Sequence, residues 1–179
     1  VLVPELISFY EYWEQQFNTS LICKREIIKP FTEEQEKNLW VKKSLDKGIE
    51  NVFLDKETYE NYQLDENYQV KSYSKVLQAG NLDVPKFLEC TKEYLKQSHT
   101  YLEEHFDYNQ LDVSATQVRY KSVSASHIIF CEGHLISKNP YFNWIPMKPA
   151  KGETLTIESQ HINLNNDIFN KGFFIMPIG

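Results

Sequence analysis

The sequence predicts a mixed fold, between α/β and α+β in class, with helices early in the chain and strands late. Residues 4–17 have apolar residues at helical spacing and residues 32–48 open with a helix-capping pattern, whereas strand-like runs dominate after residue 117. One strand–helix–strand passage spans about 76–131, which indicates that helices and strands share a layered domain. The chain has 179 residues, of which 41% are hydrophobic. That is enough apolar surface for one or two packed domains.

Two helices are expected in the first 48 residues. Leu6, Phe9 and Trp13 recur at three- and four-residue steps and predict an amphipathic helix over 4–17. Residues 21–23 and 26–31 are expected to be extended, with a proline that ends the regular structure. A second helix is predicted to begin at Thr32, which would form a capping box with the glutamine three residues later, and to stop at Gly48.

The middle of the chain combines an irregular stretch, a strand and a third helix. Residues 50–68 lack a clean period and are expected to be irregular or short-stranded, whereas 70–76 partly alternate and predict a strand. Asp83 is expected to cap the next helix, and Pro85 suits its first turn. The helix is predicted to bury a stripe formed by Phe87, Leu88, Thr91, Tyr94 and Leu95.

Four later segments are predicted to be strands: 118–123, 127–131, 153–158 and 172–178. The first, third and fourth alternate, at least in part, between apolar and polar residues. The run at 127–131 is largely apolar and is followed by Glu132 and Gly133, which would end the strand.

Composition excludes several classes of function. The net charge of −6 and pI near 5.4 provide no basic surface for nucleic acid, so no nucleic-acid partner is expected. No apolar run approaches the roughly 18 residues that a membrane span needs, so we expect a soluble, cytoplasmic protein. Cys23, Cys90 and Cys131 are widely spaced and without a histidine at metal-site spacing, so buried thiols are expected and no metal site.

The glycines do not form a phosphate-binding loop. Their spacing never approaches GxGxxG or GxxxxGK[ST], so the sequence contains no complete dinucleotide-binding half. The positions are Gly48, Gly80, Gly133, Gly152, Gly172 and Gly179.

From about residue 79 onward, the order of several motifs resembles the D-amino-acid oxidase and glycine oxidase family of FAD-dependent oxidoreductases. The motifs are the Gly-x-Leu-Asp-x-Pro pattern at 80–85, the apolar run ending at Gly133, the Lys-Gly-Glu at 151–153 and the strand-like 172–177. In that family the first leads into a flavin-domain helix, and the second is a flavin-domain strand. The last two resemble strands of the substrate domain.

The resemblance implies that the chain is the central segment of such an enzyme. It implies a linking helix at 1–19, substrate-domain parts at 20–76 and 136–179, and a partial FAD-domain segment at 77–135. The implied reaction oxidises the carbon–nitrogen bond of an amine or amino acid by hydride transfer to FAD. FAD is implied for the complete enzyme. The segment alone is expected to be inactive, because the pyrophosphate loop and the carboxylate-binding arginine lie in other parts of the family's sequence.

The resemblance also implies five site residues. Gly133 would let the backbone approach the cofactor closely, although an ordinary turn glycine would look the same. Its neighbour Glu132 stands where the family has a small residue, so this carboxylate must point away from a phosphate or pair with a cation, or the site is altered. Phe106 or Asp107 would lie near the adenine through main-chain atoms. Phe174 would face the substrate, or else be a core aromatic.

Two other functions are compatible with the residues. One is a non-enzymatic α+β binding domain whose aromatic surface recognises a protein or a small ligand. The other is a thiol hydrolase at Cys131, because His127 and His134 are near in sequence. On a strand, however, Cys131 and His134 would not share a face, and the preceding apolar run favours a buried structural cysteine.

Overall fold

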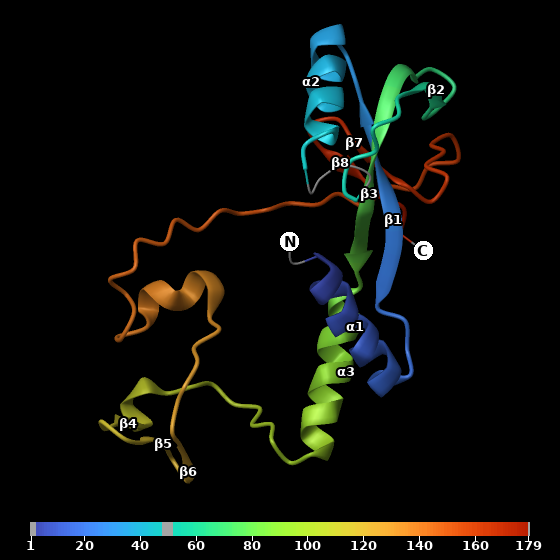
Figure 1. Cartoon of the computed structure of the whole chain (residues 1–179). Coiled ribbons are helices and arrows are strands. Elements are labelled where there is room, and N and C mark those ends of the chain that lie inside the picture. The colour runs from blue at the N-terminus through green and yellow to red at the C-terminus, as the bar shows by residue number, and fades with distance from the viewer. Residues whose placement is uncertain (1–2, 48–51, 179) are drawn as a thin grey trace. The chain divides into compact units, whose positions relative to one another are not determined.

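A computed structural model describes residues 3–47 and 52–178 and divides the chain into two compact units (Figure 1). The first unit comprises residues 1–101 and 158–179, and the second comprises 102–157. A five-stranded mixed sheet lies in the first and a three-stranded sheet in the second, which confirms the mixed α and β class. The predicted helix stop at Gly48 lies outside the described residues.

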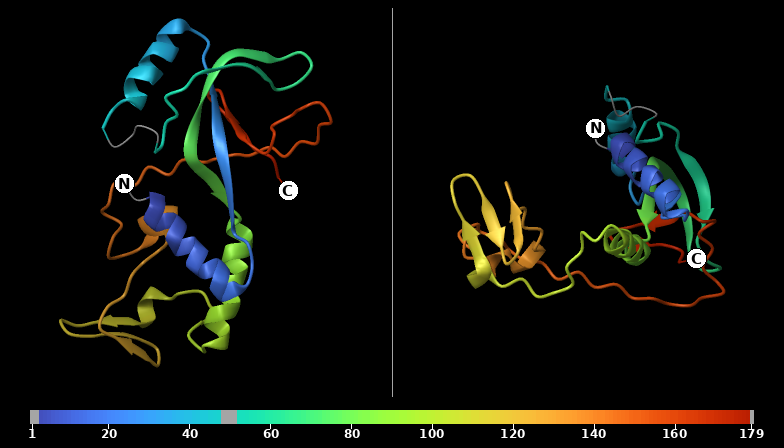
Figure 2. Two further views of the ribbon diagram at one scale, coloured as in Figure 1. Left: turned by 45° about the vertical axis from the view of Figure 1, so that its right-hand side comes forward. Right: turned by 90° about the horizontal axis from the view of Figure 1, so that it is seen from below.

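The sheet of the first unit is built around two long antiparallel strands. Its order is β2-β3-β1-β7-β8, and only β1 and β7 run parallel. Figure 2 shows the long β1–β3 pair running through the unit. The strands are β1 (Ile22–Pro30), β2 (Tyr59–Gln63), β3 (Gln69–Leu82), β7 (Ile168–Asn170) and β8 (Phe174–Ile175). The two segments predicted at 21–31 are therefore one continuous strand, which ends at its proline.

The core of the first unit joins residues far apart in the sequence. Ile28 of β1 and Phe169 of β7 are each 1% exposed and belong to one cluster with Tyr62 of β2. The rings of Tyr62 and Phe169 stack with centroids 5.9 Å apart. The Tyr62 hydroxyl donates to the carbonyl of Leu164 at 3.3 Å, and burial raises the pKa of Tyr62 to about 12.

Helices α1 (Val3–Phe17) and α3 (Val84–Gln97) confirm two of the predicted helices. Asp83 caps α3 by accepting a hydrogen bond from the backbone N–H of Lys86 at 3.1 Å. The two helices pack through aromatic rings, with Tyr10 against Phe87 at 5.3 Å and an equal spacing between Trp13 and Tyr94.

The predicted buried stripe of α3 is wrong, because none of its residues is fully buried and Leu88 is 60% exposed. Phe87 is half-buried and Tyr94 exposed, and the aromatic rings that they meet all belong to α1. Packing against α1 alone covers one side of the α3 stripe, so the side that carries Leu88 stays exposed to solvent.

Helix α2 (Glu34–Ser44) begins later than predicted. The expected capping box is wrong, since Glu36 rather than the glutamine before it reaches back to Thr32. One Glu36 carboxylate oxygen accepts both the backbone N–H of Thr32 at 2.8 Å and its hydroxyl at 2.9 Å. These bonds hold the pKa of Glu36 below its usual value. One turn after Glu36, Trp40 packs on Phe31 and its indole N–H donates to the carbonyl of Asp55 at 2.9 Å.

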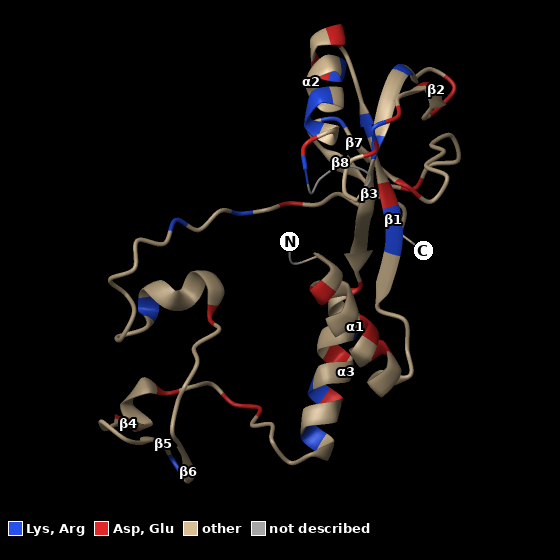
Figure 3. Ribbon diagram, in the orientation of Figure 1, with Lys and Arg blue, Asp and Glu red and all other residues tan. Residues whose placement is uncertain are grey.

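The end of α1 is tied to the start of β1 by a carboxylate. One oxygen of Glu14 accepts the backbone N–H groups of Leu21 at 2.6 Å and Ile22 at 2.8 Å. Glu11, one turn earlier, pairs with Lys24 of β1 at 2.6 Å, and Figure 3 shows the acidic residues of α1 and the basic residues of β1. The two amides lower the pKa of Glu14.

Glu14→Gln is expected to reduce the stability of the first unit at neutral pH by roughly 1 kcal/mol, after allowance for solvent screening. Because the folded-state pKa of Glu14 is depressed, the difference between wild type and variant is present above the ordinary glutamate pKa. It should shrink as pH falls through the folded-state pKa. Urea unfolding of both proteins measures this stability difference. It is followed from about pH 3 to about pH 7, a range that includes the ordinary glutamate pKa. Glu11→Gln is the control, and an equal pH dependence there would contradict the role of Glu14.

The second unit is a small antiparallel meander with two 3-10 turns. Strand β5 pairs with β4 on one side and β6 on the other. The predicted strand at 118–123 is therefore two strands, and Lys121, with φ of +50°, lies in the bend between them. The elements are η1 (Tyr108–Gln110), β4 (Leu111–Val113), β5 (Val118–Tyr120), β6 (Val123–Ala125) and η2 (Gly133–Lys138).

Two predicted strands are wrong. Residues 127–131 and 153–158 pair with no strand among the described residues, and the strand–helix–strand passage therefore lacks its last member. Ile129 is 84% exposed and Leu155 is 86% exposed. A run of apolar side chains forms a strand only where a neighbouring strand completes the ladder of hydrogen bonds, and none of the described strands does so here.

The last predicted strand, 172–178, shortens to β8, and β7 before it was not predicted. Three residues of β7 are too few to show a period, although Ile168 and Phe169 are buried. The expected burial of the cysteines is also wrong. Cys131 is exposed because its run lies outside any sheet, and Cys23 and Cys90 are only partly buried.

Candidate functional site

Four of the five predicted site residues lie in the second unit, around a cluster of aromatic rings. Phe106 stacks on Tyr120 with centroids 4.4 Å apart, and Tyr108 meets Phe106 edge-on at 5.3 Å. Phe130 joins them at 6.0 Å from Phe106. We call the whole set the aromatic cluster: Phe106, Tyr108, Tyr120, Phe130, Tyr141 and Phe142.

Glu132 is held inside this unit by two neutral donors. One carboxylate oxygen accepts the hydroxyl of Tyr108, and the other accepts the side-chain amide of Asn139 at 2.8 Å. Asn139 is fully buried, and its own oxygen accepts the backbone N–H of Tyr141 at 2.9 Å. The sequence predicted that this carboxylate points away from a phosphate or pairs with a cation, unless the site is altered. In the structure it accepts hydrogen bonds from two uncharged side chains of the same unit.

Gly133 follows directly and opens η2 with φ of +55°. No heavy atom lies within 4 Å of the position that a Cβ would occupy. Its backbone conformation is one that residues with side chains rarely adopt. The backbone at this point is therefore open to close approach by a ligand, and the adjacent carboxylate is already occupied.

Asp107 is a local cap. Its carboxylate accepts the backbone N–H of Asn109 and the side-chain amide of Gln110, each at 3.0 Å, and these bonds lower its pKa. Its backbone N–H donates to the hydroxyl of Tyr120 at 3.1 Å, and its carbonyl accepts the N–H of Gln110. Both main-chain groups are thus used within the unit. The other predicted adenine contact, Phe106, differs from Asp107, because its main chain makes no hydrogen bond to another described residue.

Phe174, the predicted substrate-facing residue, lies on β8 in the first unit and pairs with Asn170 of β7. Its side chain is 65% exposed, so it is not a core aromatic of this unit. An exposed ring at a sheet edge can pack against a ligand but cannot donate a hydrogen bond to it.

Glu132→Gln is expected to lower the pKa of Tyr108 towards the ordinary tyrosine value. In the wild type, the carboxylate accepts the phenol hydrogen and repels a phenolate, which raises the pKa of Tyr108 to about 12. The stability that this bond provides is lost as pH rises above about 10, the ordinary tyrosine pKa, through the raised value. NMR titration of labelled tyrosine, assigned with Tyr108→Phe, measures the shift.

Glu104→Gln is the matched control, because Glu104 pairs with Lys121 rather than with Tyr108. It should leave the Tyr108 titration unchanged. An unchanged Tyr108 pKa in Glu132→Gln would contradict the contact.

Sequence reasoning missed Tyr108 and Asn139. They lie 24 and 7 residues from Glu132, and no spacing rule connects them to it. The high aromatic content and the aromatic loop at 139–146 are traces of the cluster in the sequence, and neither says which rings meet.

Three further findings concern sites of other kinds. Within residues 3–47 and 52–178, no group of three acidic, cysteine or histidine side chains is placed to hold a metal ion. Over the same ranges, every helix is too short or too polar to cross a membrane. His127 contacts the hydroxyl of Ser126 at 2.9 Å through its Nδ1 atom.

Comparison with known proteins adds no assignment. No family model matches the chain, and no solved structure matches it.

Proposed function

We propose that the chain is the central segment of an FAD-dependent oxidoreductase of the D-amino-acid oxidase and glycine oxidase type, acting on an amine or amino acid. The observation that carries the proposal is the apolar run before Gly133, which lies outside the described sheets although Ile128 and Phe130 are half-buried. Ile129 is 84% exposed although its neighbours Ile128 and Phe130 are also apolar. A run of this kind is typical of a strand that is covered on both faces in a parallel sheet.

The surroundings of this run agree with a cofactor-binding domain. It follows the β4–β6 meander and leads to the open backbone at Gly133. The carboxylate of Glu132 keeps its charge, but its two oxygens are directed to the side chains of Tyr108 and Asn139, so in the proposed enzyme they would not be the groups that meet a phosphate. The residues present therefore fit a flavin nucleotide at the main chain of Gly133 and Phe106.

The strand-like residues 153–157 support the same proposal from the other side of the loop. Leu155 is 86% exposed and Ile157 is 60% exposed, at alternate positions. Alternating apolar residues are typical of a strand with one buried face. In the proposed enzyme, this segment would pair with a substrate-domain strand from polypeptide outside these 179 residues.

When bound, the flavin would supply the hydride-accepting chemistry. The residues of this chain would position the cofactor and enclose the substrate. Gly133 would let the main chain lie against the cofactor, the aromatic cluster would hold that main chain rigid, and Phe174 would pack against the substrate. The phosphate-binding loop and the group that binds a substrate carboxylate would come from outside this segment.

The longest natural form of the protein tests the proposal through its visible absorption spectrum. Flavin bands, and their bleaching without oxygen when glycine, N-methylglycine or D-alanine is added, are the expected result. Gly133→Val should reduce the bound flavin. Gly172→Val is its control, because Gly172 also has a positive φ, of +80°, and open space around it but lies in the other unit.

The absence of flavin from that form would overturn the proposal. The alternative of a binding domain without enzymatic activity would then take its place. Bound flavin that survives Gly133→Val unchanged would instead remove Gly133 from the cofactor site.

A further inference from the structure

Asn139 is fully buried in the second unit and uses both ends of its side chain. The amide nitrogen donates to a carboxylate oxygen of Glu132 at 2.8 Å, and the amide oxygen accepts the backbone N–H of Tyr141 at 2.9 Å. A buried amide that is satisfied at both ends is restricted to one orientation. Asn139 therefore links Glu132 to the loop that carries Tyr141.

The main chain of Asn139 adds further hydrogen bonds in the same region. Its N–H donates to the carbonyl of Ile136 at 3.0 Å, and its carbonyl accepts the N–H of Asn143 at 2.9 Å. The side-chain bond to Glu132 therefore joins the two ends of residues 132–139. These residues form a closed loop whose far end is fixed to the chain that follows it.

This closed loop holds the backbone of Gly133 in its observed conformation. Gly133 has φ of +55°, and no heavy atom lies within 4 Å of the position of an added Cβ. A glycine reaches many backbone conformations at similar cost, so the residue by itself does not select this one. The hydrogen bonds at both ends of the loop restrict the choice. A loop that is already ordered avoids the entropy cost of ordering it when a ligand binds.

We infer that Asn139 is a positioning residue of the flavin site, which through its bond to Glu132 holds the backbone of Gly133 open for close approach by the cofactor. This inference rests on the proposed function. The family that the chain resembles has a small residue at position 132, which has no carboxylate to accept the bond from Asn139. The Glu132–Asn139 bond therefore does not follow from the resemblance.

Asn139→Asp tests the inference, because it keeps the shape of the side chain and the acceptor for Tyr141. It replaces the donor to Glu132 with a second carboxylate oxygen, and two carboxylates at hydrogen-bond distance repel each other. In the longest natural form, stripped of flavin, we expect FAD to bind about ten- to hundredfold more weakly than to wild type. Titration of this apoprotein with FAD, followed by flavin fluorescence, measures the dissociation constant.

The double variant Glu132→Gln with Asn139→Asp exchanges the donor and the acceptor. The new amide at position 132 would donate to the new carboxylate at position 139, while its oxygen still accepts the hydroxyl of Tyr108. The affinity for FAD should therefore return to within about threefold of the wild-type value.

Amide hydrogen exchange of the apoprotein gives a readout that does not depend on FAD. The N–H of Leu135 donates to the carbonyl of Glu132 at 3.1 Å, and the N–H of Asn143 donates to the carbonyl of Asn139. Protection of these two amides should fall in Asn139→Asp and return in the double variant.

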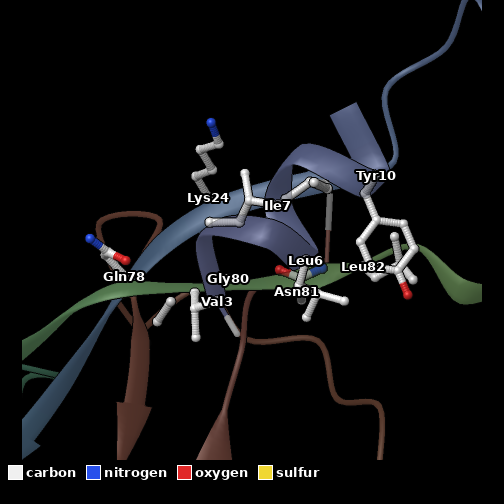
Figure 4. Close-up of a pocket in the computed structure, with 11 residues that line it drawn as sticks. Val3, Leu6, Ile7, Tyr10, Lys24, Gln78, Gly80, Asn81 and Leu82 are labelled. Atoms are coloured by element: carbon white, nitrogen blue, oxygen red, sulfur yellow. The ribbon is translucent and has the colours of Figure 1, made fainter. Parts of the chain in front are cut away.

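Two controls separate positioning from a general loss of stability. Asn143→Asp places the same charge near the loop, on an exposed side chain that makes no hydrogen bond to another described residue. Ile7→Ala removes an apolar side chain from a groove of about 250 Å³ between α1, β1 and β3 in the first unit (Figure 4). The second control should lower the thermal midpoint, and both should leave the affinity for FAD unchanged.

The outcomes distinguish this inference from the proposed function. A wild-type protein that takes up no FAD would remove both. If wild type binds FAD and Asn139→Asp binds it equally well, the inference alone is overturned. It is also overturned if the double variant restores no affinity, or if either control weakens FAD binding as much as Asn139→Asp does.

Discussion

Replacing Phe169 with alanine is expected to destabilise the first unit by about 3–5 kcal/mol, the usual cost of removing a buried phenylalanine. Phe169 is 1% exposed and contacts rings from two directions, stacking on Tyr62 at 5.9 Å and meeting Tyr68 edge-on at 6.2 Å. Its strand β7 has only three residues, so the side chain rather than the backbone ladder fixes the strand against β1. The loss should therefore extend to the pairing of β7 with β1.

Urea unfolding followed by tryptophan fluorescence measures this loss. In a Trp144→Phe background the remaining tryptophans, Trp13 and Trp40, both report on the first unit. Phe174→Ala is the control, because it removes the same side chain from the neighbouring strand at a site that is 65% exposed. It should change stability by less than about 1 kcal/mol. Equal losses in the two variants would contradict the assignment of Phe169 to the core.

Gly80→Ala is expected to cost about 3 kcal/mol, at the upper end of the range for overpacking. Gly80 lies opposite Lys24 in the β1–β3 pair. An added Cβ would overlap the carbonyl oxygen of Cys23 and lie 3.3 Å from the Cα of Lys24. Both are backbone atoms, so the methyl group can be accommodated only if the two strands move apart.

Amide hydrogen exchange locates this effect. Protection should fall at the β1 and β3 amides near Gly80, while the opposite end of the pair, near Lys29 and Ser74, changes less. Gly152→Ala is the control, since no atom lies within 4 Å of its added Cβ. Unchanged protection and stability in Gly80→Ala would mean that the strands are not as close there as the structure places them.

The helices show where local rules suffice. The spacing of apolar residues at 4–17 and the Asp83 cap before Pro85 predict α1 and α3 within one or two residues. These features depend on residues within a few positions of one another, and such contacts form in the same way whatever the rest of the chain does. The start of α2 shows the limit of these rules. Gln35 and Glu36 are both candidates to accept a hydrogen bond from Thr32, and the sequence does not choose between them.

The strands show where local rules fail. The run at 127–131 has the residues of a strand, yet the described residues provide no partner for it, so it stays outside any sheet. Conversely, β7 has little pattern of its own and becomes a strand because β1 is beside it. A segment forms a strand only when a second segment pairs with it, and the topology of the whole fold decides which segments come together.

The candidate site follows the same division. The sequence by itself determined the composition, the positions of α1 and α3, the absence of a phosphate-loop motif and the interest of residues 132 and 133. Only the tertiary structure decided that Glu132 accepts from Tyr108 and Asn139. The physical reason is separation along the chain. Arg25 donates to the carbonyl of Asn166, 141 residues away, and a contact of that kind depends on how the whole chain folds, which no local pattern records.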